Sequence, residues 1–221
     1  CSRLPTPIDP KTRNCLKTWT SLPRVMTRKL AERKTLQRLD LHLASLRSHH
    51  LYRYPEVGSG FQFSSNDYLG LSRHPAMAAA IHSAVDASDR VASTGSRLLS
   101  GHLGAWEKLE EGFSDYLGVE AALFFNSGYA ANTGLLTAIV RKQDTVFSDA
   151  ANHASLIDGI RLSGSRKVIF PHLDLDFLED ALRGNDSHEG ERFIIVESIF
   201  SMDGDCAPID ELVTLSERYD A

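Results

Sequence analysis

The sequence predicts an α/β domain built around a mostly parallel β-sheet. Strand-like runs alternate with helical patterns through most of the 221 residues, as in folds whose helices return the chain to a parallel sheet. The run 193–199 (FIIVESI) begins with continuous apolar residues, as expected of a strand that is covered on both faces. A composition of 42% hydrophobic and 24% charged residues is ordinary for a globular protein.

Hydrophobic periodicity places the individual elements along the chain. Leu36, Leu39, Leu43 and Leu46 form one face of a helix expected over 28–50. Alternating Phe61 and Phe63 between turn residues favour a short strand within 55–64. Further helices are expected at 75–87, 104–117, 129–141, 154–163, 174–183 and, on an amphipathic pattern, after Ile209; further strands are expected at 121–125, 145–148, 167–170 and 193–199.

The two ends of the chain differ from its middle. Residues 1–25 are rich in Pro, Thr, Arg and Lys without periodicity, so we expect a disordered or untranslated extension, with Met26 as a start site. Residues 26–60 are expected to be an N-terminal helical segment. Residues 61–221 are expected to be part of a larger domain, because the last helical pattern has no strand after it.

Composition argues against several classes of function. The net charge of −5 does not favour general nucleic-acid binding. No run of about 18 apolar residues occurs, so we expect no membrane span. Cys1, Cys15 and Cys206 have neither zinc-site nor disulfide-framework spacing, and a reducing cytoplasm is the simplest expectation. No His–Asn/Asp arrangement identifies Cys206 as a nucleophile.

A candidate anion site lies in residues 124–139 (FFNSGYAANTGLLTAI). A predicted strand leads into Ser127 and Gly128, and a helix follows at once. Free N–H groups at a helix start bind anions, and a glycine lets the backbone approach a phosphate. The alternative is that Asn126 or Ser127 only caps the helix and Gly128 only relieves the turn.

His153 opens the helix that follows the next predicted strand. Ligands of open α/β sheets bind at the carboxyl ends of the strands, and a planar imidazole can stack on an aromatic ring and form hydrogen bonds. The alternative is a solvent-exposed or capping histidine. The remaining histidines are expected to be surface or packing residues: His49, His50, His74, His82, His102, His172 and His188.

The third feature is the segment 193–205 (FIIVESIFSMDGD). Ser201 lies just past the predicted strand and could donate a hydrogen bond to a ligand. Glu197 and Asp203 could act as acid–base groups, but a structural hydrogen-bonding role for Glu197 and turn chemistry for Asp203 are favoured. No His/Asp/Glu cluster has the spacing of a metal site.

Together, these segments resemble the α-oxoamine synthase family of fold-type I pyridoxal-phosphate enzymes. The resemblance covers about residues 35–221 and rests on five motifs: SSNDYLGLSRHP (64–75), STGSRLLSGHLGAWEKLE (93–110), FFNSGYAAN (124–132), NHASLIDG (152–159) and ESIFSMDGD (197–205). It implies the three-layer, mostly parallel sheet of the fold-type I large domain, here truncated before the end of the sheet.

The resemblance also implies residue roles with pyridoxal 5′-phosphate as cofactor. Backbone groups of Gly128 and Tyr129 match the phosphate-binding positions. His153 matches the histidine that stacks on the cofactor ring and takes part in catalysis and substrate positioning. A further three positions match residues that contact the cofactor, the amino-acid carboxylate and the acyl substrate, respectively: Ser201, Asn66 and, on a looser alignment, Arg53.

Residues 93–101 (STGSRLLSG) resemble the biotin-biosynthetic branch of the family. That branch implies L-alanine and a pimeloyl thioester, on CoA or acyl carrier protein, as substrates, and a homodimer as the active form. Branches such as 2-amino-3-ketobutyrate ligases and 5-aminolevulinate synthases stay open. No lysine here matches the Schiff-base motif, so this polypeptide is expected to be inactive alone. The alternative of another class is a non-catalytic binding or dimerisation module.

Overall fold

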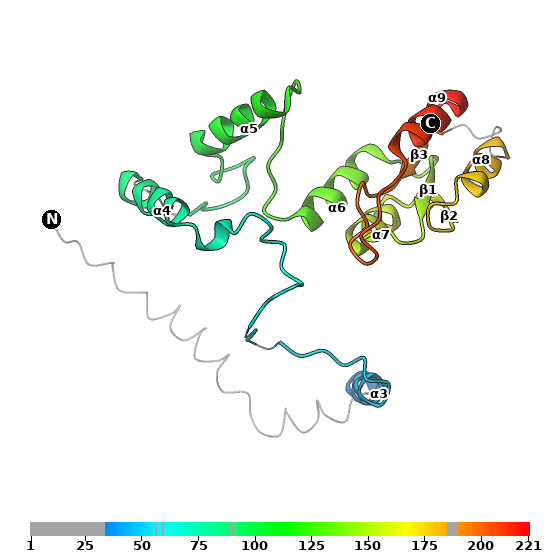
Figure 1. Ribbon diagram of the computed structural model, residues 1–221, viewed down its shortest axis with the longest axis horizontal. Helices are drawn as coiled ribbons and strands as arrows, with labels where there is room; N and C mark the ends of the chain where they lie inside the picture. The colour runs from blue at the N-terminus through cyan, green and yellow to red at the C-terminus, as the bar shows by residue number, and fades with distance from the viewer. Residues whose placement is uncertain (1–33, 56, 59, 89, 91, 185–189) are drawn as a thin grey trace. The chain divides into compact units, whose positions relative to one another are not determined.

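The computed structural model describes residues 34–55, 57–58, 60–88, 90, 92–184 and 190–221 (Figure 1). The chain divides into two compact units, residues 1–83 and 84–221. The predicted extension 1–25 and the expected start at Met26 lie outside the described residues. The predicted boundary between 60 and 61 stays a prediction.

The first unit contains helix α3 (Lys34–Ser48), the 3-10 helix η1 (Leu71–Arg73) and the beginning of α4 (Pro75–Ala87). The predicted helices at 28–50 and 75–87 are confirmed over the described residues. The predicted strand within 55–64 is wrong: none of its described residues is in a strand, and Phe61 and Phe63 are exposed. Alternation alone does not make a strand, because a strand also needs a hydrogen-bonded neighbour.

The second unit is organised around three parallel strands in the order β2-β1-β3. The central strand β1 (Thr145–Asp149) is buried along its whole length. It pairs with β2 (Arg166–Phe170) through Val146↔Lys167 and with β3 (Arg192–Ile195) through Val146↔Phe193. The last pair on the β3 side is Ser148↔Ile195, so β3 ends four residues before its predicted end.

Helices cover both faces of this sheet. α5 (Gly104–Leu117) and α6 (Gly128–Ile139) precede β1, α7 (Ala154–Ser163) and α8 (Leu175–Arg183) connect the strands, and α9 (Ile209–Tyr219) follows β3. Figure 1 shows β1–β3 between the pair α6 and α7 and the pair α8 and α9. This arrangement confirms the predicted three-layer α/β class.

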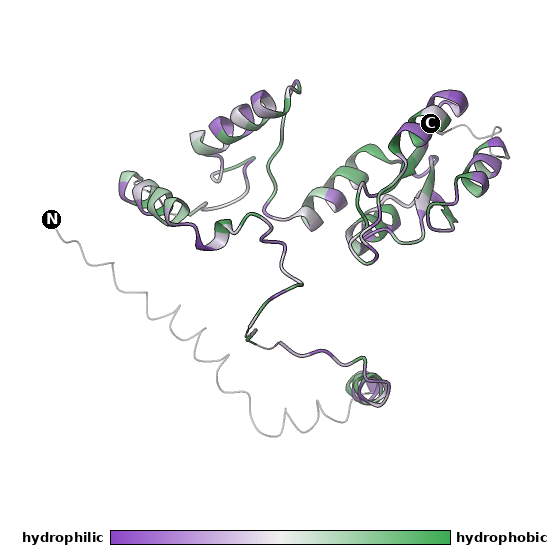
Figure 2. Ribbon diagram, in the orientation of Figure 1, coloured by the Kyte–Doolittle hydropathy of each residue, from purple (hydrophilic) through white to green (hydrophobic). Residues whose placement is uncertain are grey.

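Successive residues of β1 supply two separate cores, because neighbouring side chains of a strand point to opposite faces. Val146 packs with Leu136 of α6 and Ile160 of α7. Phe147 packs with Leu178 of α8 and Leu212 of α9. Figure 2 shows α6 as hydrophobic along most of its length, as a helix that lies against a sheet should be.

The segment 121–125 is not a strand, contrary to its prediction. Leu123 is 66% exposed, and Phe124 stacks on Trp106 of α5 with ring centroids 5.3 Å apart. The Phe124 N–H donates to Glu110 Oε1 at 2.8 Å rather than to a ladder. Among the described residues, no strand lies beside this segment for it to pair with.

Within the described ranges, no helix combines the length and the apolar character that crossing a membrane requires. The same residues contain no group of three or more His, Cys, Asp or Glu side chains that could hold a metal ion.

Candidate functional site at the carboxyl edge of the sheet

Asn152 ties the carboxyl ends of β1 and β3 together. Its Nδ2 donates to Ser148 Oγ at 3.0 Å and to the carbonyl oxygen of Ile195 at 2.7 Å. The residue is only 5% exposed, and its Oδ1 is buried without a partner among the described atoms. The turn between β1 and α7 therefore has a fixed position at the sheet edge.

His153 follows in that turn and caps α7. Its Nδ1 lies 3.2 Å from the Ser155 backbone nitrogen and 2.7 Å from Ser155 Oγ. The Ser155 N–H can only donate, so Nδ1 accepts and the ring proton lies on Nε2. The exposed His153 ring thus turns an N–H donor away from its own helix.

Hydrogen bonds of the Asn132 and Ser155 side chains, here called the relay behind His153, fix the orientation of this ring. Asn132 of α6 donates from Nδ2 to Ser155 Oγ at 2.9 Å, and the fully buried Ser155 hydroxyl donates onward to His153. The His153 backbone N–H donates to Glu197 Oε1, just past β3. Glu197 therefore has the structural hydrogen-bonding role that the sequence favoured.

The start of α6 leaves backbone donors free. Ser127 caps the helix, and its Oγ accepts from the Ala130 N–H at 3.1 Å. Among the described residues no acceptor meets the N–H groups of Gly128 and Tyr129. A Cβ added at Gly128 would meet no atom within 4 Å, so a ligand can approach these donors. The capping role and the open donors therefore coexist, and together they suit an anion.

The starts of α6 and α7 lie side by side. The rings of Tyr129 and His153 are edge to face, with centroids 6.5 Å apart at 77°. The Tyr129 hydroxyl donates to Asp158, which raises the pKa of Tyr129. Asp158 also binds Arg161 at 3.2 Å. The open start of α6 and the imidazole of His153 therefore lie next to each other.

Gly159 allows this close approach of the two helices. A Cβ at this position would lie 2.9 Å from Leu136 Cδ1 and 3.3 Å from the Asn132 carbonyl oxygen. Any larger side chain would push α7 away from α6 and stretch the Asn132–Ser155 hydrogen bond.

Ser201 belongs to neither of these helix starts. It is exposed in the turn after β3 and forms no hydrogen bond with another predicted site residue in the described part of the chain. Asp203 is exposed in the same turn, in agreement with its expected turn chemistry.

Asn66 and Arg53 belong to the first unit and are exposed there. Asn66 precedes Asp67, which accepts hydrogen bonds from the N–H and the hydroxyl of Ser72. These bonds lower the pKa of Asp67. The SSNDYLG motif therefore folds as a local turn that fixes the backbone on either side of Asn66.

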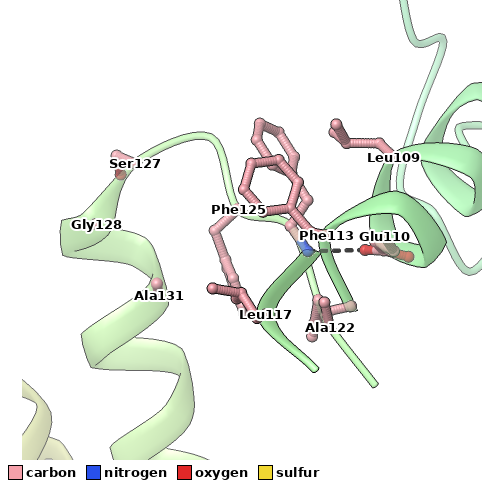
Figure 3. A pocket seen from close by; sticks show the side chains of 11 residues that line it. Leu109, Glu110, Phe113, Leu117, Ala122, Phe125, Ser127, Gly128 and Ala131 are labelled. Atoms are coloured by element: carbon pink, nitrogen blue, oxygen red, sulfur yellow. Dashed lines mark hydrogen bonds between the residues drawn. The ribbon is translucent and has the colours of Figure 1, made fainter. Parts of the chain in front are cut away.

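An apolar cavity of about 320 Å³ adjoins the start of α6. Figure 3 shows that its lining comes from α5 and from the segment before α6, with Ser127 and Gly128 at its edge. Arg97 clasps Glu110 at 2.6 Å and 2.8 Å, which lowers the pKa of Glu110 to about 2. Glu110 in turn accepts from Phe124 N–H and so fixes the cavity wall.

The sequence analysis missed Asn132, Ser155 and Asp158. The spacing of NHASLIDG offers a partial signal, because a serine two residues after a helix cap can reach back to the cap. His172 was expected to be a surface or packing residue; it does pack against Phe200, but its hydrogen-bonding role was missed. It bridges Asp149 at 2.8 Å and Asp205 at 2.9 Å.

Comparison with known proteins identifies relatives for most of the chain. The sequence profile of the family "Aminotransferase class I and II" matches residues 59–221. An 8-amino-7-oxononanoate synthase of Thiobacillus denitrificans is 41% identical over 199 residues, covering 84% of this chain and 51% of that protein. One of Burkholderia vietnamiensis is 47% identical over 168 residues, covering 72% and 40%. The chain thus spans about half the length of these relatives.

Solved structures agree with these sequence matches. Sphingomonas wittichii serine palmitoyltransferase superposes with a TM-score of 0.65 at 32% identity, covering 69% of this chain and 38% of that one. The 8-amino-7-oxononanoate synthase of Francisella tularensis gives a TM-score of 0.56 at 29% identity, covering 69% and 41%. Because the family profile covers well over half of the sequence, the chain belongs to the aminotransferase class I and II family.

Proposed function

We propose that this chain is the cofactor-binding part of an 8-amino-7-oxononanoate synthase. The reaction is the decarboxylative condensation of L-alanine with a pimeloyl thioester, on CoA or acyl carrier protein, and it releases carbon dioxide and the free thiol. The observation that carries the proposal is the pairing of the open α6 start with the fixed imidazole of His153. The identities of 41% and 47% to relatives of that name support this branch of the family.

The residues present fit pyridoxal 5′-phosphate. The cofactor phosphate needs donors and positive potential, and the unpartnered N–H groups of Gly128 and Tyr129 at the α6 start supply both. The cofactor ring needs a flat face to stack on, and the exposed His153 ring supplies one. When bound, the cofactor acts as an electron sink for charge that develops at the substrate Cα.

The chain's own residues would orient the reactants around that group. The His153 Nε2–H would donate to a substrate oxygen, because Nδ1 is already occupied by Ser155. Ser201 would donate its hydroxyl to a cofactor oxygen, Asn66 would bind the amino-acid carboxylate and Arg53 the acyl substrate. The positions of Ser201 and Asn66 in the family motifs support their assignments, and a looser alignment of residues 51–53 supports that of Arg53.

We propose a cytoplasmic homodimer as the working form. Leu98 and Leu99 of the STGSRLLSG motif are 95% and 85% exposed, and apolar side chains of this kind are commonly covered at subunit interfaces. Light scattering after size exclusion would measure the mass, and a monomer at micromolar concentration would contradict the dimer.

The test is to express the longest reading frame that contains this chain and to add the cofactor. We expect a visible absorbance band from the bound cofactor and L-alanine-dependent thiol release from pimeloyl-CoA, with 8-amino-7-oxononanoate identified by mass spectrometry. Absence of the band would overturn the cofactor assignment and favour a non-catalytic module. Turnover with glycine or serine but not alanine would move the protein to another branch.

Variants of His153 separate site chemistry from folding. His153→Ala should abolish product formation, whereas the solvent-exposed control His82→Ala should leave it unchanged. Because His153 also caps α7, circular dichroism must show that the variant retains its helices. Full activity in folded His153→Ala would contradict the role of the imidazole.

A further inference from the structure

A second network lies at the carboxyl edge, around the end of β1. The Asp149 side chain is fully buried and accepts from the N–H groups of Ala151 at 2.8 Å and Leu173 at 2.9 Å. Leu173 has a left-handed backbone (φ 56), which turns its N–H back toward this carboxylate. His172 adds a third donor through Nδ1 at 2.8 Å.

The second ring nitrogen of His172 contacts the segment after β3. His172 Nε2 lies 2.9 Å from Asp205 Oδ2. Its ring meets the buried ring of Phe200 edge-on, with centroids 4.5 Å apart at 83°. His172 is thus the contact through which the turn after β2 holds the residues after β3.

Those residues form a closed loop, here called the 199–206 loop. Ile199 and Cys206 make an antiparallel bridge, the Phe200 N–H donates to the Asp205 carbonyl at 2.9 Å, and the Gly204 N–H donates to the Phe200 carbonyl at 2.8 Å. Ser201 lies at the exposed tip. Because the loop is internally bonded, fixing Phe200 and Asp205 also fixes Ser201.

The hydrogen-bond geometry decides the charge of the imidazole. Asp149 and Asp205 are acceptors when ionised, and each faces a different ring nitrogen of His172. Only the imidazolium has two N–H donors. Asp174, which shares the turn with His172, accepts from the Phe177 N–H instead. The charged groups that act on the ring are therefore the two carboxylates on either side of it.

We propose that His172, as an imidazolium, fastens the 199–206 loop to the carboxyl edge of the sheet and so positions Ser201. The bond pattern requires a proton that neutral histidine lacks, so the loop is held below the midpoint of the His172 titration and released above it. The same two carboxylates raise the pKa of His172. Only the part given to Ser201 rests on the proposed function; the fastening itself does not.

A pair of variants tests the charge requirement. In His172→Gln, the amide can donate to one carboxylate but leaves the other without its charged partner. In Asp205→Asn, the new amide can donate to Nε2 of a neutral ring while Nδ1–H still serves Asp149, so the contact no longer needs the extra proton. His82→Gln, on exposed α4, is the matched control.

The experiment uses the full chain and two measurements over a range of pH that spans neutrality. Histidine Cε1–H signals in NMR give the His172 midpoint, assigned by its loss in His172→Gln. Hydrogen exchange of peptides covering 198–207, corrected for the intrinsic pH dependence and referenced to α7, gives the protection of the loop.

In the unmodified chain and in His82→Gln, we expect a His172 midpoint above the ordinary value of about 6.5, with loop protection falling roughly tenfold as pH rises through it. His172→Gln should have the low protection at every pH. Asp205→Asn should lower the midpoint and remove the step. A midpoint at or below the ordinary value, or a loop whose protection has no step there, would overturn the proposal. If His172→Gln fails to fold, the signal that shifts in Asp205→Asn but not in His82→Gln assigns His172, and the remaining titrations decide. None of these readouts needs cofactor, so the proposed function can fail separately.

Discussion

Replacing Ser155 with alanine tests whether the relay behind His153 contributes to the free energy of unfolding. The Ser155 hydroxyl is fully buried and serves Asn132 Nδ2 at 2.9 Å and His153 Nδ1 at 2.7 Å. Its removal leaves the half-buried Asn132 amide without this acceptor, which costs about 1–3 kcal/mol. His153 keeps the Ser155 backbone N–H at 3.2 Å and is open to water, so its part of the cost is small.

The expected net loss in the free energy of unfolding is therefore about 1–2 kcal/mol, after a few tenths gained from the better helix propensity of alanine. Urea unfolding followed by circular dichroism measures it. Ser216→Ala is the matched control, because Ser216 is a half-buried helical serine whose hydroxyl donates to the Val213 carbonyl of its own helix. Its effect should stay within about 0.5 kcal/mol.

Nitrogen chemical shifts of the His153 ring provide a second, independent readout. The unmodified chain should show the Nε2–H tautomer, and Ser155→Ala should show a mixture, since one of two donors to Nδ1 is gone. The reasoning is refuted if Ser155→Ala matches Ser216→Ala in stability and retains a single tautomer.

Three further substitutions probe the frame around the site. Arg97 holds the pKa of Glu110 at about 2 instead of 4.5. The stabilising contribution of the ion pair is therefore complete above pH 4.5 and is lost as the pH falls toward 2. Glu110→Gln should make the urea midpoint of unfolding depend less on pH in this range, and an unchanged pH dependence would contradict this. Gly159→Ala places a Cβ 2.9 Å from Leu136 Cδ1 and should destabilise the protein by about 1–3 kcal/mol. Gly112→Ala, which lies in open space, should instead stabilise it by about 0.4–1 kcal/mol. Equal changes in the thermal unfolding midpoint would contradict the packing argument. Gly128→Ala meets no atom within 4 Å, so it should not destabilise the fold. Cofactor affinity, measured by calorimetry on the complete protein, should fall roughly tenfold; an unchanged affinity would contradict phosphate binding at this turn.

Hydrophobic patterns were sufficient to predict those helices and strands whose own residues indicate the buried face. The strand-like pattern of β1 and the amphipathic pattern of α9 were predictable because Phe147 and Leu212 are each buried on the face that the pattern predicts. The segments 61–63 and 121–125 have equally good strand patterns, yet neither is a strand in the described structure. A strand depends on a neighbour that its own residues do not specify, so periodicity could not decide these two cases.

The sequence was sufficient to predict which helix starts form the site, but not which side chains contact one another there. The rule that ligands bind beyond the carboxyl ends of parallel strands indicated His153, the free N–H groups of a helix start indicated Gly128, and the two helix starts do adjoin. The contact of Asn132 with Ser155 spans 23 residues, and that of His172 with Asp205 spans 33. Contacts of this range follow from how helices and turns pack, which a single sequence does not reveal.

The end of β1 explains how one strand can serve two networks. Ser148 and Asp149 are adjacent, so their side chains leave opposite faces of the sheet. Ser148 binds Asn152, which leads to His153 on the face covered by α6 and α7. Asp149 binds His172, which leads to the 199–206 loop on the face covered by α8 and α9. The two networks meet at β1 and in the turn that follows it, where Asp149 accepts from the Ala151 N–H. Because neither Ser155 nor His172 bonds a side chain of the other network, the effects of Ser155→Ala and His172→Gln should add; a large coupling between them would mean that the edge moves as a whole.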